Sequence, residues 1–515
     1  MINKKKLISI LMVLVMVLSC ISCGKVKEEL GDEHYPDVDF DQEPITITYL
    51  TIGDKPGNGM TEKVVARINE LLLKKVNAKL DIYYIGWDDY LNHYNKVLEG
   101  NDTELDLIAT GTDWLDAWPN VFNGNFLPMS PEMLKTYCPR TYKNVTEEQW
   151  EKCSLNGSIY FIPENEYSQW TNHGFIYRSD IAAEAGLDEI HSWADLEQYV
   201  NYVLENRPDL ITWDSDGSST VVTLGYLMSM SKYVPIYEIS TYGIWGADAE
   251  NLDKIYSPYY VGDDLLEFAR LMKRWNEQGV WKADPLAAEG GYKAFYEGSA
   301  ALEQHHTQNF YTDIKPTMEH RQTGTDVHFF WFGEDCGNLL RTSFLHGAMA
   351  VSSRSKNPEK ALMVYDILRN DEECYRLLRY GFEGTQYVIN SDGLMEKPSG
   401  YNSDRDSIVT NFWWGRRDEL ELYDASFAWD DYKALVDGYE KVAIDYPWDG
   451  IPFAGADVQD KISAVIGVCD RYIPEISFGR YNGSPEDEIE SFREALKKAG
   501  IEEVTKKLQE FLDTY

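Results

Sequence analysis

Three apolar runs decide the fold: ITITYL (45–50), KLDIYY (79–84) and LDLIAT (105–110). The first two are rich in β-branched and aromatic residues, and the third is apolar enough to be buried on both faces of a sheet, so all three are predicted strands. Between them, helical spacing of apolar residues predicts helices at about 61–76 and 88–99. A strand–helix–strand–helix–strand order predicts a parallel sheet with right-handed crossovers, and therefore an α/β protein.

The loops that follow these strands are the first candidates for a binding site. In open α/β sheets, ligands lie beyond the carboxyl ends of the strands. That rule selects the loops at 51–60 and 111–118, and the second of them contains Asp113 and Trp114.

Further strands and helices continue to the end of the chain. Ser192 is a predicted N-cap, Gly279 and Gly500 follow helical patterns, and a proline opens the helix at 358. The predicted strands are 158–162, 175–178, 299–304 and 347–351, and the predicted helices begin at 181 and 193 or span 265–278, 358–369 and, as a pair around Gly500, 487–512.

The N-terminus has the pattern of an export signal. Three lysines at 4–6 precede an apolar run at 7–19, which is shorter than the ~20 residues of a membrane-spanning helix. Cys20 and Cys23 follow, each after a serine, in an arrangement that resembles the lipobox of bacterial lipoproteins, whose cysteine receives a diacylglyceryl group. We favour Cys23, which precedes a glycine, over Cys20, which has Val17 three residues before it. An ordinary cleaved signal without lipid is the alternative.

Charge and length constrain the chain beyond the leader. Residues 1–22 are the predicted signal peptide, and the acidic segment 23–44 is nearly free of aliphatic residues, so it is a predicted flexible stalk. Roughly 470 residues remain, which is too many for one core and predicts at least two lobes. The formal charge of −38 excludes a basic nucleic-acid footprint.

Cysteine and motif content argue against metal and cofactor chemistry. The five later cysteines are scattered without zinc-like spacing, so free buried thiols are expected, although Cys138 and Cys153 are a possible pair. The adjacent histidines 305 and 306 have no third ligand nearby in the sequence. No GxSxG, HExxH, P-loop or GxGxxG motif is present. We expect no metal, no cofactor and no enzymatic activity.

Several stretches together resemble one family, the family 1 extracellular solute-binding proteins of carbohydrate ABC importers. The likeness is strongest to the long, LipO-like lipoproteins of Gram-positive bacteria, which carry an extra C-terminal region. It spans about 45–515 and rests on the number and order of the stretches. These are DLIATGTDW (106–114), GSIYFIP (157–163), FIYRSDIAAEAGL (175–187), SWADLEQYV (192–200), FYEGSAALEQ (295–304), HGAMAVSSRSKNPEKALMVYDIL (346–368) and YGFEGTQYV (380–388).

The resemblance implies a two-lobe, periplasmic-binding-protein-like fold of type II, with a hinge between the lobes and the ligand held between them. Residues 45–160 and 311–370 are then expected to form lobe 1, and residues 161–310 and 371–515 to form lobe 2 with the C-terminal region. The expected crossings between lobes lie near 158–163, 309–316 and 370.

Sugar chemistry selects the candidate ligand contacts. A pyranose packs its apolar C–H face on aromatic rings, and its hydroxyls bond to planar polar groups. Adjacent aromatic and polar residues on ligand-side loops are therefore the candidates. These are Asp113, Trp114, Glu164, Glu166, Trp170, His305, Gln308, Trp331, Glu383 and Tyr387. Helix capping by Asp113 and packing of Trp114 inside the lobe are the structural alternatives.

The predicted function is capture of a carbohydrate, in particular an oligosaccharide, and its delivery to ABC permease subunits by hinge closure. The expected protein is a monomer on the extracellular face of the cell membrane, held there by lipid. The alternatives are a secreted glycoside hydrolase, which needs two carboxylates at a fixed separation, and a glycan-binding surface adhesin.

Overall fold

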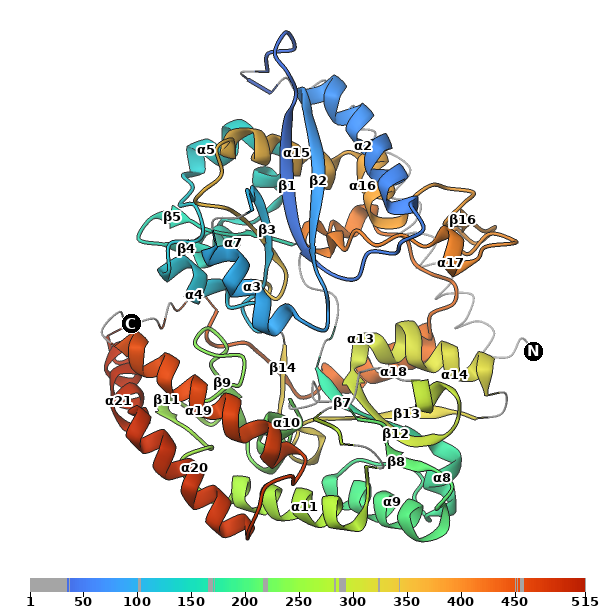
Figure 1. The fold of residues 1–515 in the computed structure, drawn as a ribbon, viewed down its shortest axis with the longest axis vertical. Helices are drawn as coiled ribbons and strands as arrows, with labels where there is room; N and C mark the ends of the chain where they lie inside the picture. Colours follow the sequence, from blue (N-terminus) through green and yellow to red (C-terminus); the bar gives the residue numbers. More distant parts are fainter. Residues whose placement is uncertain are drawn as a thin grey trace, which may run out of the picture.

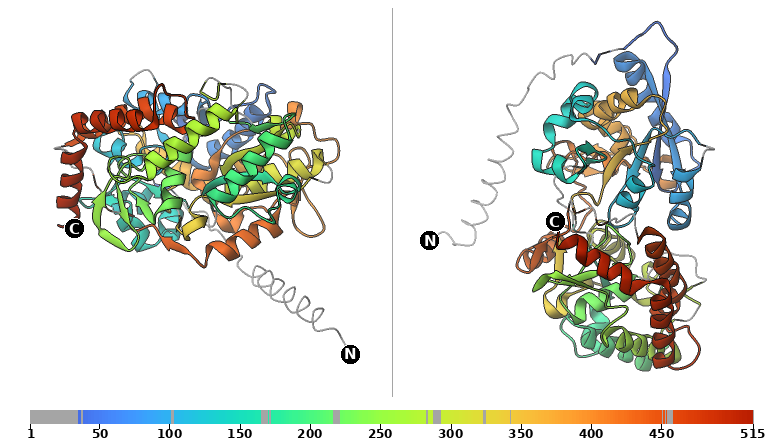
Figure 2. Two further views of the ribbon diagram at one scale, coloured as in Figure 1. Left: turned by 90° about the horizontal axis from the view of Figure 1, so that it is seen from below. Right: turned by 90° about the vertical axis from the view of Figure 1, so that its left-hand side faces the viewer.

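The computed structural model describes residues 35–36, 38–100, 103–164, 170, 172–215, 221–281, 284–286, 293–322, 325–341, 343–449, 451, 453 and 458–514. They form two lobes, one above the other in Figure 1 and again in the side view of Figure 2.

The apolar runs at 45–110 form the parallel part of the first lobe's sheet. β1 (Ile45–Ile52) lies between β2 (Ala78–Ile85) and β3 (Leu107–Thr110) and is parallel to both. The connecting helices α2 (Met60–Val76) and α3 (Tyr90–Glu99) confirm the predicted alternation. The carboxyl ends of β1 and β2 point toward the second lobe (Figure 1), so the loops that the sequence selected face that lobe.

A strand from far along the chain completes this sheet. β15 (Ala348–Val351) lies antiparallel between β3 and β6 (Ile162–Pro163), which gives the order β2-β1-β3-β15-β6. Next in the chain are α15 (Pro358–Asn370), whose last ten residues are all buried, and α16 (Glu372–Tyr380). Smaller elements of this lobe are α4 (Ala117–Phe122), α5 (Pro131–Tyr137), α6 (Pro139–Asn144), α7 (Glu147–Lys152), β4 (Ser154–Leu155), β5 (Ser158–Ile159), β16 (Val388–Ile389), β17 (Met395–Glu396), α17 (Ser403–Asp406), η5 (Phe412–Gly415) and η6 (Asp418–Leu420).

The second lobe is built on a mixed sheet of order β13-β7-β12-β8. β7 (His173–Arg178) is antiparallel to β12 (Ala300–His306) and β13 (Val327–Trp331), and β8 (Ile211–Trp213) is parallel to β12. Other elements are α8 (Ser179–Glu184), α9 (Trp193–Asn206), α10 (Val221–Met230), β9 (Tyr233–Pro235), β10 (Gly246–Asp248), β11 (Asn251–Tyr256), α11 (Asp264–Gln278), α12 (Lys293–Tyr296), α13 (Thr307–Asn309), η3 (Phe310–Ile314), α14 (Lys315–Arg321), η4 (Glu334–Cys336), β14 (Leu339–Arg341), α18 (Trp429–Tyr439) and β18 (Ala443–Asp445).

Three helices at the C-terminus pack on the outside of the second lobe. These are α19 (Gln459–Ser477), α20 (Pro485–Ala499) and α21 (Ile501–Leu512). Gly500 separates the last two with a φ of 101°, in the left-handed region that glycine tolerates best. Their apolar faces join the same buried cluster as α9 and α11, so this region is an integral layer of the lobe.

The borders of the lobes differ from the predicted ones. β13 belongs to the second lobe's sheet, so residues 311–322 and 325–341 lie there and not in lobe 1. Conversely, α16 and η5 bury Leu378 and Trp414 in the core of the first lobe, so residues 371–420 lie there and not in lobe 2. A short apolar strand carries no local information about which of two sheets it will join.

Between the described elements, the chain passes from one lobe to the other three times. The crossings lie after β6, between β14 and β15, and between η6 and α18. The first is adjacent to the predicted position near 158–163. The other two crossings differ from the expected positions near 309–316 and 370. They lie later in the chain because β13 belongs to the second lobe, and α16 and η5 belong to the first.

Part of the predicted stalk is packed onto the first lobe. Tyr35 is only 7% exposed, its hydroxyl donates to Asp366 Oδ2 at 2.7 Å, and it accepts from Arg140 Nη2 at 2.9 Å. Asn77 Nδ2 donates to the carbonyl of Asp39 at 2.8 Å. The segment is polar, as predicted, yet one aromatic side chain with a buried hydrogen-bond partner is enough to fix its end.

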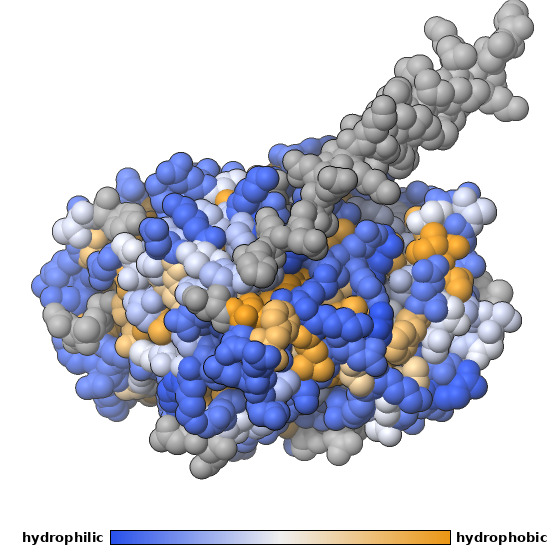
Figure 3. All heavy atoms as spheres, turned by 90° about the horizontal axis from the view of Figure 1, so that it is seen from above, coloured by the Kyte–Doolittle hydropathy of each residue, from blue (hydrophilic) through white to orange (hydrophobic). Residues whose placement is uncertain are grey.

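The exterior agrees with the acidic composition. The face drawn in Figure 3 is mostly hydrophilic with small apolar patches. Within the described ranges, no helix has both the length and the apolar character needed to cross a bilayer. All five later cysteines are free thiols, and Cys138 and Cys153 are both buried and unpaired by a disulfide.

Candidate functional site

The loop after β3 meets the second crossing at the boundary between the lobes. Thr112 N donates to the Leu345 carbonyl at 2.9 Å, and Trp114 Nε1 donates to the His346 carbonyl at 2.8 Å. A Cβ at Gly111 would lie 2.3 Å from that same carbonyl oxygen, so glycine is required for this close approach. These contacts hold the loop after β3 against the second crossing.

Asp113 forms an ion pair with His346. The imidazole Nδ1 lies 2.9 Å from each carboxylate oxygen. Burial alone would lower the pKa of His346, but the charge and hydrogen bond of Asp113, assisted by Glu164, outweigh it and raise that pKa. Both side chains remain about one-fifth exposed, at 23% and 18%, so they are accessible from the boundary between the lobes.

Glu164 lies against the same crossing from the other side. Its backbone N–H donates to the Gly347 carbonyl at 3.1 Å, and its carboxyl group occupies the space that a side chain at Gly347 would need. Burial raises the pKa of Glu164 to about 7, against the opposing charges of Arg416 and His346. The charges of residues at or beside the three crossings therefore change one another's pKa values.

Four tryptophans cover the adjacent edge of the first lobe, and we call Trp87, Trp114, Trp413 and Trp414 the tryptophan cluster. The ring of Trp114 is nearly parallel to those of Trp87 (6.2 Å between centroids, 16°) and Trp414 (5.6 Å, 15°). Trp413 lies 6.1 Å from Trp87. Trp87 is 40% exposed, which is unusual for a side chain of this size, so an apolar ring face is open to solvent here.

Three histidines and a glutamine form the facing part of the second lobe. Gln304 Nε2 donates to His173 Nδ1 at 3.0 Å, and the rings of His305 and His306 lie 4.2 Å apart. Burial lowers the pKa of His173 to about 4, of His305 to about 3 and of His306 well below its usual range. These imidazoles are therefore neutral hydrogen-bonding groups at pH 7.

A second polar group from the same lobe lies within range of the charge of Asp113. Tyr446 donates its hydroxyl to Glu238 Oε2 at 2.6 Å and accepts from the Tyr237 N–H at 2.9 Å. Burial is the main cause that raises the pKa values of Tyr237, Glu238 and Asp449, and the charge of Asp113 raises each further. The charge of Asp113, on the first lobe, therefore acts on groups of the second lobe across the boundary.

The structure brings four predicted contacts together and leaves others apart. Asp113, Trp114 and Glu164 meet at the boundary between the lobes, and His305 belongs to the facing histidine group. Gln308 is half-buried in the short helix α13, directly after that group. Glu166 lies outside the described residues.

Trp170 and Trp331 have a packing role in this structure. Both lie against Tyr439, with ring centroids 5.1 Å and 5.6 Å away, inside an apolar cluster of the second lobe. Arg341 also lies 5.2 Å over the Trp170 ring. Each tryptophan is at least 92% buried, so little ring area is left for a ligand.

Glu383 and Tyr387 pair with each other in a turn after α16. They form a single β-bridge, and Tyr387 packs on Tyr380. The following strand β16 lies on the outer flank of the first lobe (Figure 1). Among the described contacts, none of theirs reaches the group around Asp113.

Sequence reasoning missed Trp87, His346, Tyr237, Glu238 and Asp449. Trp87 had a usable signal, since it follows β2 just as Trp114 follows β3. The other four lie on connecting segments whose neighbours come from distant parts of the chain.

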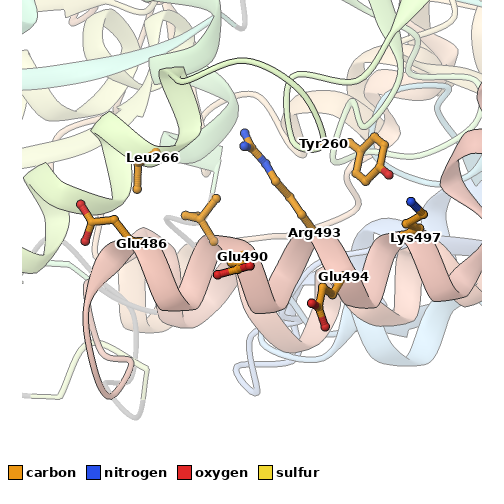
Figure 4. Close-up of a pocket in the computed structure, with 8 residues that line it drawn as sticks. Tyr260, Leu266, Glu486, Glu490, Arg493, Glu494 and Lys497 are labelled. Atoms are coloured by element: carbon orange, nitrogen blue, oxygen red, sulfur yellow. The ribbon is translucent and has the colours of Figure 1, made fainter.

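A surface hollow of about 340 Å³ lies on the outside of the second lobe, between α11 and α20 (Figure 4). Its polar groups already bind partners. Arg270 holds Glu486 at 2.5 Å, Tyr260 donates to Glu502 at 2.6 Å, and Arg493 donates to the Gly262 carbonyl at 2.5 Å. It therefore offers few unsatisfied groups, in contrast to the boundary between the lobes. Among the described residues, no group of three or more His, Cys, Asp or Glu side chains has a geometry able to hold a metal ion.

Known proteins resemble the chain over almost its whole length. It is 23% identical, over 92% of both chains, to a carbohydrate ABC transporter substrate-binding protein of Streptococcus pneumoniae serotype 4. Residues 450–515 match the family described as a domain of unknown function, DUF3502.

Solved structures with a similar fold include two-lobe solute-binding proteins. The N-glycan transport protein NgtS of S. pneumoniae, in complex with Man5GlcNAc, is 18% identical with a TM-score of 0.67, covering 91% of this chain and 98% of that one. The alginate-binding protein AlgQ2 is 13% identical (TM-score 0.65; 93% and 99% covered), and an extracellular solute-binding protein of Bifidobacterium longum subsp. infantis is 15% identical (TM-score 0.62; 92% and 99%). The predicted fold and the predicted relationship to carbohydrate-transport binding proteins are confirmed.

Proposed function

We propose that this homologue of carbohydrate ABC transporter substrate-binding proteins captures an oligosaccharide outside the cell and delivers it to ABC permease subunits. Its similarity to such a protein over 92% of both chains supports the transport role. The complexes of NgtS with Man1GlcNAc and Man5GlcNAc support an oligosaccharide as the class of ligand. The chain acts by binding, without chemical change to the ligand.

The observation that carries the proposal is that groups of both lobes lie within range of the charge of Asp113. One side supplies the exposed ring of Trp87, and the other supplies neutral imidazoles, Gln304 and Tyr237. An aromatic face suits the C–H side of a sugar ring, and carboxylate, amide and imidazole groups suit its hydroxyls.

The proposed mechanism is closure of the two lobes around the ligand. A saccharide that touches the tryptophan cluster and the histidine group at once makes all its contacts only when the lobes are close. Its binding therefore shifts the population toward the closed form. Three crossings of the chain provide the hinge, and the ion pair between Asp113 and His346 lies beside the second of them.

The proposed location is the outer face of the cell membrane. We propose that Cys23, or alternatively Cys20, carries the lipid, and that the protein acts as a monomer. The export pattern of the leader supports the location, and two acyl chains are sufficient for stable anchoring.

A binding screen tests the function. The protein without its leader is mixed with manno-, gluco-, xylo- and N-acetylglucosamine oligosaccharides and with uronate oligomers, and its melting temperature is measured. A ligand at 100 times its Kd should stabilise the folded state by about 2.7 kcal/mol, and the melting temperature should rise accordingly.

Calorimetry and small-angle scattering on the hits complete the test. Binding with a stoichiometry of one and a smaller radius of gyration are the expected results. Binding without compaction would favour an adhesin, and release of reducing ends in proportion to protein would favour a hydrolase.

A further inference from the structure

Two histidines lie side by side at the edge of the second lobe's sheet that adjoins the first crossing. His173 is the first residue of β7 and pairs with His306, the last residue of β12. Residues directly opposite each other in an antiparallel pair point to the same face of the sheet, and these two rings are 5.5 Å apart. Both side chains are half-buried. Because the first crossing leads directly into β7, both rings lie at the boundary between the lobes.

The backbone fixes which nitrogen of His306 carries the proton. The side chain caps the short helix α13, and its Nδ1 accepts the backbone N–H of Asn309 at 3.2 Å. A backbone amide can only donate, so Nδ1 must be the unprotonated nitrogen. A proton on Nδ1 would break this bond, and a second proton would also place a positive charge beside the ring of His305, 4.2 Å away. The neutral ring with its proton on Nε2 satisfies this geometry.

Gln304 fixes the proton of His173 in the same way. The amide nitrogen of Gln304 donates to Nδ1 of His173 at 3.0 Å, so this ring also carries its proton on Nε2. Among the described residues, no neighbour forms a hydrogen bond with Nε2 of His173 or of His306. The two rings therefore present two N–H donors that the described part of the protein leaves without an acceptor.

We infer that the Nε2–H groups of His306 and His173 donate hydrogen bonds to the saccharide. A sugar offers acceptors as hydroxyl oxygens and, in N-acetylated units, as acetamido carbonyl oxygens. A donor that loses water when the lobes close and gains no acceptor would cost free energy, so the site selects a ligand with oxygens at these two positions. This inference rests on the proposed function, and it names the groups with which the second lobe recognises the ligand.

Two substitutions separate the two nitrogen atoms of His306. Asparagine places an acceptor near the position of Nδ1 and is a good N-cap, but it has no group at the position of Nε2. His306→Asn should therefore weaken binding about tenfold, which corresponds to about 1.4 kcal/mol, and leave the midpoint of urea unfolding unchanged. Glutamine reaches the position of Nε2 and can donate there, but it is a poor cap. His306→Gln should keep Kd within about threefold of the wild type and lower the urea midpoint.

The affinity is measured by calorimetry with mannotetraose, cellotetraose and chitotetraose, and the urea midpoint by tryptophan fluorescence. His320→Asn is the matched control, since it changes an exposed histidine of the same lobe, on α14, and it should alter neither quantity. His173→Asn is a second binding variant. Its side-chain oxygen can still accept from Gln304, so it should weaken binding by a similar factor without loss of stability.

NMR measures the position of the two protons directly. Long-range correlation spectra of protein labelled with ¹⁵N-histidine distinguish a ring protonated on Nε2 from one protonated on Nδ1. We expect the Nε2–H pattern for both His306 and His173, whose signals are assigned by their loss in the variants.

The results that overturn the inference differ from those that overturn the proposed function. If a saccharide binds the wild type, and His306→Asn binds it equally tightly or loses no more affinity than His306→Gln, the inference is wrong while the proposed function stands. A proton on Nδ1 of His306 also contradicts the inference. If no saccharide of this set or of the wider screen binds the wild type, the proposed function fails and the inference fails with it.

Discussion

Glu164→Gln should change how the stability of the protein depends on pH. The Glu164 carboxyl group is 6% exposed, and burial raises its pKa from 4.5 to about 7. The folded protein therefore retains this proton to a higher pH than the unfolded chain does. The stabilising contribution is fully present below pH 4.5 and is lost as the pH rises through 7.

The size of the effect follows from the two pKa values. Each unit of pKa difference is worth about 1.4 kcal/mol, so ionisation of Glu164 costs the wild-type protein about 2 to 3 kcal/mol of folding free energy between pH 5 and pH 8. Glutamine cannot ionise and has nearly the same shape as the protonated acid. The variant should thus match the wild type at pH 5 and be more stable by that amount at pH 8.

Urea unfolding followed by tryptophan fluorescence measures this difference. The free energy of unfolding is determined at pH 5, 6, 7 and 8 for the wild type, for Glu164→Gln and for Glu205→Gln, an exposed control on α9. The control should follow the wild type, because its side chain is exposed and loses no hydration on folding. If the gap between wild type and Glu164→Gln stays constant over the whole range, the reasoning about this buried carboxyl group is refuted.

Three other substitutions test separate parts of the molecule. Trp87→Ala should weaken binding of the screened oligosaccharide about tenfold in calorimetry, through loss of a stacking face, while Phe40→Ala, at an aromatic that is 55% exposed, should leave Kd unchanged; equal effects would contradict the assignment. Tyr35→Phe should lower the free energy of unfolding by about 1 to 3 kcal/mol without changing Kd, because Asp366 loses a buried donor. Asp113→Asn should lower the pKa of His346 in NMR titration, since the charge that raises it is removed; an unchanged pKa would mean that the pair does not form in solution.

Local sequence patterns were sufficient for most individual elements. The runs at 45–110 contain their own strand and helix periodicity, so the predicted alternation, and the loops that face the second lobe, followed directly. Ser192 and Gly500 marked helix ends through their backbone preferences, and the side chain of Ser192 does accept from Asp195 N. The position of Asp113 and Trp114 at the boundary between the lobes was predictable, because the rule for parallel strands needs only the end of β3.

Long-range partners were not encoded in any local pattern. β13 and β15 are both short apolar runs, yet one joins the second lobe's sheet and the other the first. Which sheet a strand joins depends on the packing of distant segments. The resemblance to a family therefore placed the borders of the lobes only approximately. Trp170 and Trp331 were misleading for the same reason, because they pack on Tyr439 from α18.

The residues that complete the site are distant from one another in sequence. His346 is 233 positions from Asp113, and Tyr446 is 208 positions from Glu238. Neither partner has a distinctive neighbourhood, and a titratable residue on a connecting segment is more often solvated than paired. Only the three-dimensional arrangement brings these partners together.

The buried phenol of Tyr35 limits the distance between the folded lobes and a lipid anchor at the N-terminus. With a lipid on Cys23, as proposed, only eleven residues separate the bilayer from a point fixed on the first lobe, and such a chain reaches at most about 40 Å. The protein is then confined to a thin layer above the bilayer, which raises its local concentration at a transporter in the same membrane. A weak docking interaction with that transporter would be occupied more often than it would be for a protein free in solution.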